Sequence, residues 1–425
     1  MAKNVNTDVL IIGAGASGLT AAIFAAEKGA SVVVVEHGPK AAKKILLTGN
    51  GRCNLSNTTF ERGVYRGADP AFAHRVLEGF TPDDTLDFFH ESGILTTVEQ
   101  GRVYPSTFEG NLVSEVLIKR LDESGAGLFL NAGIYDLHKS DAGFLATIES
   151  EDESGKNKFK VNSKTLILAC GGASYPKTGS DGSGYNMAKS FGHRLNPVFP
   201  ALCHLVSKED YPQSLHGVRA ISRVSLFIDG SKSATEVGEV QFTKKGISGV
   251  PVLSLSRFAS KALSEGGKVE LSVDFAADMD EKKLRDELSR RKNSFPSRSA
   301  GDLLSGIVHR KTAVLICRLC RVKPSDRCSS VKDGILSKMT DCVKNFRMEI
   351  IGTSPLEEAQ CTAGGIDVSD VNPSDMQSIL CPGLFFAGEM LDVDGTCGGY
   401  NLQFAWSSGA LAGMAAANIS RKDNS

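Results

Sequence analysis

The stretch TDVLIIGAGASGLTAAIFAAEKGASVVVVE, residues 7–36, determines the fold of this chain. The apolar run Val9–Ile12 predicts a buried strand, and Val32–Val35 predicts a second one. Between them, Ser17–Lys28 is rich in alanine and predicts a small-residue helix. The order strand, tight turn, helix, strand is that of a dinucleotide-binding α/β unit.

Three glycines, Gly13, Gly15 and Gly18, join the first strand to this helix with the spacing G-x-G-x-x-G. The first allows the turn, the second lets a pyrophosphate approach the backbone, and the third lets the helix lie close to the sheet. The phosphates then face the free N–H groups at the positive end of the helix. Glu36 ends the second strand and is placed to bind the ribose hydroxyls of an adenosine. The alternative is a glycine-rich turn used only for packing, and the turn alone does not distinguish FAD from a nicotinamide dinucleotide.

Composition and charge are those of an ordinary globular protein. The chain has 425 residues, of which 41% are hydrophobic and 23% charged, so we expect two or three domains. No apolar run approaches the roughly 18 residues of a membrane span, and the polar start MAKNVNTD does not resemble a signal peptide. We therefore expect a cytoplasmic protein without membrane contact. The net charge of −1 indicates no polyanionic partner for the chain as a whole.

Ten cysteines are scattered along the chain without regular pairing, and we expect them to be reduced and mostly buried. Cys317 and Cys320 form a C-x-x-C, and Cys328 follows eight residues later. No second C-x-x-C or nearby histidine completes a metal site, and the helical spacing favours packing over metal or redox chemistry.

The segment KKILLTGNGRCNLSN, residues 43–57, follows the second strand as a long polar loop. Its glycines and asparagines expose backbone N–H groups, and Lys43, Lys44 and Arg52 add positive charge. Such a loop suits a ligand with phosphates and ring carbonyls, although a purely structural Ω-loop is the alternative. A long excursion at this point is typical of FAD, because the flavin half reaches far beyond the adenosine.

The next segment predicts a series of short elements. Helices are expected over residues 70–79 and 82–93, the second with Thr81 as N-cap, and a further helix over 110–123. Residues 101–106 resemble an edge strand stopped by Pro105. Further strands are predicted over 127–130, 133–137, 144–148 and 158–161.

Residues 164–193 repeat the strand–turn–helix pattern of the opening. Thr165–Ala169 predicts a buried strand that runs into Gly171 and Gly172, and a helix is expected over Tyr185–Phe191. A glycine turn of this kind beside a dinucleotide is a second contact with the cofactor; a plain connection is the alternative.

From residue 196 the pattern changes to alternating apolar and polar residues, as in Val224–Gly230 and Lys268–Phe275, which predicts antiparallel strands. Gly246–Gly249 is expected to be a glycine-rich turn, and residues 281–345 predict helices. Residues 281–338 contain 15 Lys/Arg and 6 Asp/Glu, a net charge of +9. This segment is either a solvated helix face or a docking surface for a polyanion such as RNA.

The last block, residues 359–418, contains a third glycine-rich turn. Gly383–Ala387 predicts a strand that ends at Gly388 and Glu389, and a small-residue helix is expected from about Leu402 to Ala417. The positive N-terminus of such a helix can face the flavin pyrimidine edge, where the reduced ring carries negative charge. Three such turns spread over the chain favour FAD, since a nicotinamide dehydrogenase normally needs only the first.

Six motifs together resemble the YhiN/BaiN-like family of NAD(P)/FAD-dependent oxidoreductases, which is related to aminoacetone oxidase-like flavoproteins. The matching segments are GAGASGL at 13–19, KKILLTGNGRCNLSN at 43–57, GRVYPS at 101–106, LACGGASYPKTGSDGSGY at 168–185, FTKKGISGVPVLSLS at 242–256 and AGEMLDVDGTCGGYNLQFAWSSG at 387–409. Lys244 stands where a histidine is usual in the family, so any role of that histidine does not carry over.

The resemblance implies an α/β fold with a three-layer (β/β/α) Rossmann-like FAD-binding domain and inserted β-barrel-like and helical domains. The expected boundaries are 1–195 plus 351–425 for the first, 196–280 plus about 340–350 for the second and 281–340 for the third. It also implies noncovalent FAD and reduction of activated C=C bonds, with bile-acid enones or a ribosomal RNA uridine among the family's proposed substrates.

The glycine turns and the resemblance together give a set of candidate site residues. The flavin ring is expected near 50–53, 174–175 and 396–401. The candidate proton donors are Tyr400, Cys53 and Cys397, and no metal ligand is expected. The candidate cofactor-binding residues are Gly13, Ala14, Gly15, Ala16, Ser17, Gly18, Glu36, His37, Lys44, Thr48, Gly49, Asn50, Gly51, Arg52, Cys53, Asn54, Gly133, Ile134, Ala169, Cys170, Gly171, Gly172, Gly388, Glu389, Asp394, Gly398, Gly399, Tyr400, Asn401 and Leu402.

The resulting hypothesis is an oxidoreductase in which hydride passes from NAD(P)H, bound transiently, through FAD to a conjugated C=C, while an acid supplies the proton. One alternative has the same chemistry act on ribosomal RNA held by residues 281–338. Another is an amine oxidase that passes electrons to oxygen, and a third is a flavin-binding protein without turnover. The substrate is therefore a small molecule or RNA, and the sequence does not give the oligomeric state.

Overall fold

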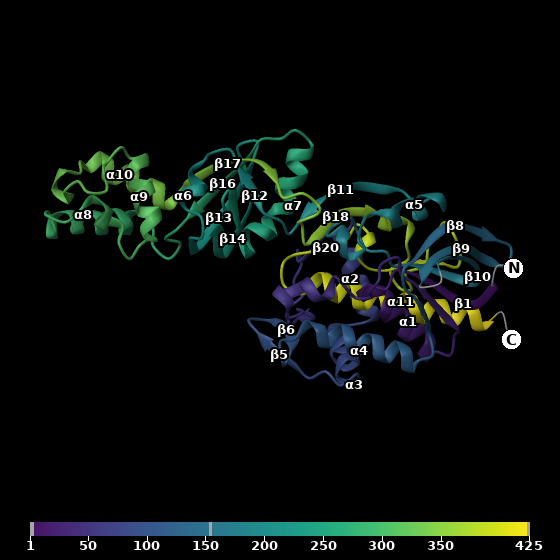
Figure 1. The fold of residues 1–425 in the computed structure, drawn as a ribbon. Coiled ribbons are helices and arrows are strands. Elements are labelled where there is room, and N and C mark those ends of the chain that lie inside the picture. The colour runs from purple at the N-terminus through teal and green to yellow at the C-terminus, as the bar shows by residue number, and fades with distance from the viewer. Residues whose placement is uncertain (1–3, 153–154, 423–425) are drawn as a thin grey trace. The chain divides into compact units, whose positions relative to one another are not determined.

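The computed structural model describes residues 4–152 and 155–422, and the first three residues of the polar N-terminal segment lie outside that description. The chain divides into two compact units (Figure 1). The first consists of residues 1–198 and 360–425, and the second of residues 199–359. The expected three-domain division stays a prediction.

A seven-stranded mixed sheet forms the centre of the first unit. Parallel pairing joins β7, β2, β1, β10 and β19, while β10, β9 and β8 pair antiparallel. The strands span Asn4–Ile12 (β1), Val32–Val35 (β2), Gly127–Phe129 (β7), Ala132–Ser140 (β8), Gly143–Asp152 (β9), Gly155–Leu168 (β10) and Leu384–Phe386 (β19). The predicted order strand, helix, strand at the start of the chain is thus confirmed, with α1 over Ala16–Glu27.

Helices and short strands complete the first unit. The long C-terminal helix α11, Tyr400–Lys422, packs against α1. The other helices are α2 (Pro70–Gly79), α3 (Pro82–Glu91), α4 (Gly110–Glu123) and α5 (Ser183–Ser190), and the short strands are β3 (Ser56–Asn57), β4 (Tyr65–Arg66), β5 (Thr96–Glu99), β6 (Arg102–Pro105), β11 (Leu195–Ala201), β18 (Cys361–Ile366) and β20 (Asp394–Gly395). Thr81 caps α3 as expected, within a capping box that Asp84 completes.

Two predictions for the first unit are wrong. The segments 158–161 and 165–169 do not form separate strands, because β10 continues through the polar residues between them. It is hydrogen-bonded to β9 along its first part and to β19 at its end, with β1 on its other side. Residues 101–106 do not form an edge strand either, since β6 lies between β3 and β5. Pro105 is tolerated there because β3 pairs only with Arg102 and Val103.

The second unit contains a closed barrel in the strand order β12-β15-β14-β13-β16-β17. Its strands span Leu205–Ser207 (β12), Arg219–Ile228 (β13), Ser231–Phe242 (β14), Gly246–Gly249 (β15), Val269–Asp274 (β16) and Phe346–Thr353 (β17). The helices of this unit are α6 (Tyr211–Ser214), α7 (Val250–Ser264), α8 (Glu281–Ser294), α9 (Arg310–Leu319) and α10 (Asp333–Lys344). The helices expected after residue 281 are confirmed, and so is the α/β fold class with a Rossmann-type sheet and an inserted barrel.

Two features of the barrel differ from the sequence prediction. Gly246–Gly249 forms strand β15 instead of a turn, because a Cβ at either glycine would clash with a backbone carbonyl of the neighbouring strand. Residues 250–264 form helix α7 instead of an alternating strand. Serines between apolar residues imitate a strand pattern there, but Pro251 fits the first turn of a helix.

The cysteines Cys317, Cys320 and Cys328 are buried in the core of the second unit. Among the described residues, no group of histidine, cysteine and carboxylate side chains has the arrangement of a metal site. None of the helices in the described chain is long and apolar enough to span a bilayer.

The close contact of α1 with α11 predicts a sharp stability effect. A Cβ at Gly413 would clash with the carbonyl oxygen of Ala21, so Gly413→Ala should destabilise the first unit by about 1–3 kcal/mol. Gly334→Ala, in α10, is the control, since its Cβ would meet open space. Urea unfolding curves measure both, and a Gly413→Ala protein as stable as the wild type would contradict the packing described here.

Candidate functional site

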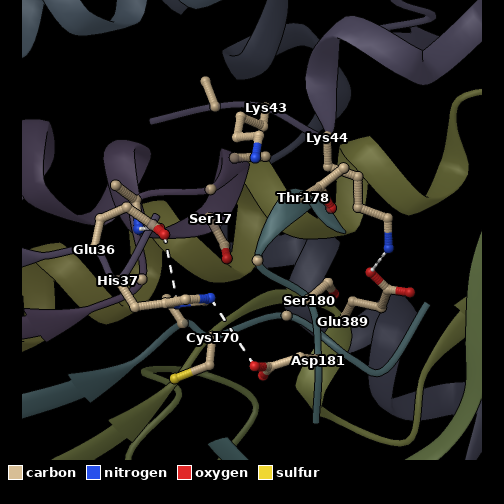
Figure 2. Close-up of a pocket in the computed structure, with 18 of the residues that line it drawn as sticks. Ser17, Glu36, His37, Lys43, Lys44, Cys170, Thr178, Ser180, Asp181 and Glu389 are labelled. Carbon is tan, nitrogen blue, oxygen red and sulfur yellow. Dashed lines mark hydrogen bonds and ion pairs between the residues drawn. The ribbon is translucent and has the colours of Figure 1, made fainter. Parts of the chain in front are cut away.

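A cavity of about 400 Å³ opens at the carboxyl ends of β1, β2 and β10 in the first unit. This is where open parallel sheets bind ligands, and the volume is within the range of about 300–1,000 Å³ typical of ligand pockets. Figure 2 shows Glu36 and His37 on one side of the cavity, Lys44 and Glu389 on the other, and Ser17 between them.

The three glycines of the turn after β1 have different roles, two in packing and one at the ligand cavity. Gly13 has a φ of +104°, and a Cβ there would clash with the carbonyl of Ala169, while a Cβ at Gly18 would clash with the carbonyl of Gly13. These two glycines are therefore required by the fold itself. Gly15 differs, because a Cβ there would meet nothing within 4 Å, and it lines the cavity. A turn used only for packing does not require a glycine at position 15.

The N-terminus of α1 faces this open space. Gly15 is its N-cap, no side chain caps its first turn, and that turn contains no acidic residue. Ala16 and Ser17 at the start of the helix also line the cavity. The helix N-terminus thus presents uncapped N–H groups and partial positive charge, which is the arrangement that binds a diphosphate.

Glu36 is fixed beside the glycine turn. Its Oε2 accepts a hydrogen bond from the backbone N–H of Ala14 at 2.9 Å, and its Oε1 accepts one from Gly38 at 2.7 Å. His37 continues the polar edge, with Nδ1 3.5 Å from Oε1 of Glu36 and Nε2 4.0 Å from Oδ2 of Asp181 (Figure 2). The carboxylate is buried but retains acceptor capacity toward the cavity, as binding to ribose hydroxyls requires.

An ion pair between Lys44 and Glu389 forms the opposite side, with Nζ 2.6 Å from Oε2. Ser174 links both partners, since Lys44 Nζ donates to its hydroxyl at 2.7 Å and that hydroxyl donates to Oε1 of Glu389 at 2.8 Å. The backbone N–H of Thr362 donates to the same oxygen. Burial by itself would raise the pKa of Glu389. The charge of Lys44 and these hydrogen bonds outweigh that effect, so the pKa of the carboxyl lies below its ordinary value.

The polar loop after β2 contributes only its first part to the cavity. Lys44, Ile45 and Thr48 line it, and Ile45–Gly51 forms a 3-10 helix interrupted at Thr48, Gly49 and Asn50. Arg52 points elsewhere: its guanidinium lies 3.4 Å from Glu99 and over the ring of Phe108.

The third glycine turn places the start of α11 at the cavity through Asn401 and Leu402. The side chain of Asn401 accepts from the backbone N–H of Gly395 at 2.8 Å and donates to its carbonyl at 3.0 Å, which fixes this end of the helix. Gly399, with a φ of +94°, makes the turn possible, since a Cβ there would clash with the carbonyl of Ser56.

The three candidate proton donors are not part of the cavity lining that the structure describes. Cys53 is fully buried, and burial raises the pKa of its thiol to about 12. Cys397 is partly buried, and burial raises its pKa as well. The ring of Tyr400 packs edge-on against Phe60 and Tyr65. None of the three is among the described residues that line the cavity, so their catalytic role stays a prediction.

The cavity brings together residues from all three predicted glycine turns. The predicted cofactor-binding residues that line it are Gly13, Ala14, Gly15, Ala16, Ser17, Glu36, His37, Lys44, Thr48, Gly133, Ile134, Ala169, Cys170, Gly171, Glu389, Asn401 and Leu402. Those placed outside its lining are Gly18, Gly49, Asn50, Gly51, Arg52, Cys53, Asn54, Gly172, Gly388, Asp394, Gly398, Gly399 and Tyr400. Several of the second set shape the turns, as Gly18 and Gly399 do.

Other lining residues lie outside the set of candidate cofactor-binding residues. Lys43 is one of them, although it belongs to the loop that the sequence favours for ligand binding; the others include Lys40, Thr178, Gly179, Ser180, Asp181, Ser183, Met187, Gln360 and Cys361. Residues 178–183 belong to the loop after β10, where glycines and hydroxyl side chains gave a usable signal. Gln360 and Cys361 gave none, because they reach the cavity only through long-range pairing of β18 with β11.

The residues present fit a dinucleotide: an uncapped helix N-terminus, an open position above Gly15, and a fixed carboxylate beyond them. Fold and cavity define the class as a dinucleotide-binding protein with a Rossmann-type sheet. The family model described as HI0933-like protein Rossmann domain matches residues 7–415, and the chain belongs to that family. This confirms the resemblance to the YhiN/BaiN-like proteins, and the chain is an FAD-dependent oxidoreductase.

Curated relatives match over nearly the whole chain. A Clostridium scindens protein named 3-dehydro-bile acid delta(4,6)-reductase is 36% identical over 409 residues, covering 96% of this chain and 98% of the relative. A Haemophilus influenzae protein named ribosomal RNA dihydrouridine synthase is 30% identical and covers 97% and 98% of the two chains. An Escherichia coli protein of the same name is 28% identical and covers 94% and 96%.

A solved structure of quinol-fumarate reductase with menaquinol molecules is similar in fold. The match has a TM-score of 0.53 at 15% identity and covers 99% of this chain and 72% of the other. At that identity the likeness concerns the fold alone.

The lowered pKa of Glu389 predicts a pH dependence of stability. The ionised carboxylate stabilises the fold fully above its ordinary pKa of 4.5, and this contribution is lost as the pH falls through the lower folded value. Glu389→Gln should therefore lose less stability than the wild type in urea unfolding as the pH falls below 4.5. Glu99→Gln, which removes an exposed partner of Arg52, is the control. Equal slopes for wild type and Glu389→Gln would contradict the assignment.

Proposed function

We propose that this oxidoreductase reduces an activated C=C bond of a small molecule and takes its electrons from NAD(P)H. The cavity beside the glycine turn, with Gly15 open and Glu36 fixed, is the observation that supports the cofactor assignment. The relative named as a delta(4,6)-reductase, at 36% identity over 96% of the chain, supports the reaction class. FAD, when bound, supplies the two-electron chemistry that connects a nicotinamide donor with a conjugated acceptor.

Side chains and backbone N–H groups of the cavity bind different parts of a noncovalent FAD. Glu36 accepts hydrogen bonds from the ribose hydroxyls, and the N–H groups of Gly15, Ala16 and Ser17 bind the diphosphate. On the opposite side of the cavity, Lys44 and Glu389 compensate each other's charge at 2.6 Å and offer polar groups to the ligand without net charge.

The proposed proton donors are Tyr400, Cys53 and Cys397. The proposed domain organisation has three parts, namely residues 1–195 plus 351–425, residues 196–280 plus about 340–350, and residues 281–340. The protein is proposed to act in the cytoplasm.

A second candidate function is reduction of a uridine in ribosomal RNA. Two relatives that match 94% and 97% of this chain carry the name ribosomal RNA dihydrouridine synthase. The net charge of +9 over residues 281–338 supports RNA contact. The acids that pair with these cations, such as Glu287 with Arg290 and Arg291, are already included in that net charge. The small-molecule reaction is the first proposal because the relative named as a delta(4,6)-reductase has 36% identity, against 28% and 30% for these two.

Gly15 offers a test of the cofactor site that separates binding from folding. A Cβ at this position meets open space, so Gly15→Ala should cost the apoprotein only about 1 kcal/mol, from the poorer N-cap. The same methyl group occupies the space for the diphosphate and should weaken FAD binding roughly tenfold or more. Calorimetric titration of the apoprotein with FAD measures the affinity. Unchanged affinity would contradict the proposed diphosphate position.

The reaction is tested by anaerobic titration of the purified holoprotein. NADH or NADPH should bleach the absorbance of the oxidised flavin, and a conjugated enone added afterwards should restore it. Bleaching by an amine together with hydrogen peroxide formation in air would favour the amine oxidase alternative. Absence of bleaching by either nicotinamide would contradict the proposed donor.

RNA contact predicts a salt-dependent affinity. Binding of ribosomal RNA should weaken steeply between about 50 and 200 mM salt, and alanine at Arg321, Lys323 and Arg327 should reduce the slope by up to about 3. Lys119→Ala, on α4 of the first unit, is the matched surface control. No RNA retention at low salt would exclude this second candidate.

A further inference from the structure

Four cysteines gather in the helical part of the second unit, and two of them face each other. Cys320 directly follows α9, and Cys342 lies in the last turn of α10. Their sulfur atoms are 4.0 Å apart, although the residues are 22 positions apart in the sequence. Helices α9 and α10 pack together, so the contact belongs to the core of this unit.

We propose that Cys320 and Cys342 are a redox modification site that forms a reversible disulfide with hydrogen peroxide as the oxidant. A disulfide needs the sulfurs at about 2.05 Å, so they must approach by about 2 Å. Rotation of two side chains that already touch across adjoining helix ends supplies such a movement. The sequence pairs Cys320 with Cys317 in a C-x-x-C, but the sulfur contact in the fold joins Cys320 to Cys342.

The two thiols are suited to different steps. Cys342 is partly exposed, whereas Cys320 is buried. The hydrogen bond between the two thiols lowers the pKa of the Cys342 thiol and raises the pKa of the Cys320 thiol. Cys342 is therefore the nucleophile, since the thiolate is the reactive form, and Cys320 is the resolving thiol held against it.

The reaction balances without any further reagent. The Cys342 thiolate attacks one oxygen of hydrogen peroxide, the O–O bond breaks, and a sulfenic acid and hydroxide form; the hydroxide takes up a proton to give water. The sulfur of Cys320 then attacks the sulfenic sulfur, the S–O bond breaks, and the second hydroxide leaves with the Cys320 proton as water. Two thiols and one peroxide thus give one disulfide and two waters, and a thiol reductant reverses the change.

The other two cysteines of the group provide internal controls. Burial raises the pKa of the Cys317 thiol to about 11. Cys328 donates its S–H to the carbonyl of Ser299 at 3.1 Å. The sulfur–sulfur contact joins Cys320 to Cys342, so oxidation should select this pair.

A disulfide at this position closes the segment 320–342, which carries the exposed cations Arg321, Lys323 and Arg327. Cross-linking restricts the conformations open to such a segment, and it stabilises the fold mainly by constraining the unfolded chain. The oxidised protein should therefore unfold at a higher temperature than the reduced one. This consequence does not depend on the substrate or on FAD.

Peptide mapping of the full-length protein tests the proposal. Trypsin cleavage at Arg318, Arg321, Lys338 and Lys344 puts Cys320 in peptide 319–321, Cys342 in 339–344 and Cys317 in a separate peptide. After mild peroxide treatment, non-reducing digestion should yield 319–321 linked to 339–344 with the loss of two hydrogen atoms. Dithiothreitol should restore both free thiols.

Variants assign the two roles. Cys320→Ser should leave a sulfenic acid at Cys342 that dimedone traps, Cys342→Ser should abolish the cross-link, and Cys317→Ser should leave it unchanged. Peroxide treatment of the wild type that oxidises other cysteines first, or links Cys320 to Cys317, would overturn the proposal. The wild-type map decides this even if a variant does not fold.

Discussion

The candidate site depends on how closely the first turn of α1 lies against the end of β10. Gly13 and Gly18 have no room for a side chain, because the carbonyl oxygens of Ala169 and Gly13 occupy the positions of their Cβ atoms. This contact aims the uncapped N-terminus of α1 at the ends of β1, β2 and β10. The remaining glycine of the motif, Gly15, faces open space, and this separates the role of ligand binding from that of packing within one turn.

Two further constraints hold distant segments at this turn. Helix α11 lies directly on α1, where Gly409 and Gly413 meet the carbonyls of Ser17 and Ala21. On the opposite side of the cavity, the Lys44–Glu389 ion pair joins segments 345 residues apart in the sequence. Removing one charge of such a partly buried pair leaves the other uncompensated, so the pair fixes the position of both segments. The cavity is therefore assembled from both ends of the first unit's sequence.

Local signals in the sequence predicted much of this fold. The apolar runs of β1 and β2, the proline starts of α2 and α3, and the amphipathic pattern of α4 each depend on neighbouring residues, and they were correct or nearly so. The secondary-structure prediction is wrong where burial in the core overrides the local preference of the residues. Helix α7 buries most of its residues, including serines that imitate a strand alternation. Strand β15 uses glycines for close contact with its neighbours. Other features depend on long-range packing, which no local pattern encodes. They are the position of Gln360 and Cys361 at the cavity, the pairing of Lys44 with Glu389, and the contact between Cys320 and Cys342.

The central claim is that the cavity in the first unit holds FAD, with its adenosine half between the glycine turn and Glu36. The most direct measurement is to denature the purified protein and to identify the released flavin by chromatography and mass spectrometry. The account predicts FAD in a ratio approaching one per chain. Release of FMN, or of no flavin after reconstitution with excess FAD, would contradict it.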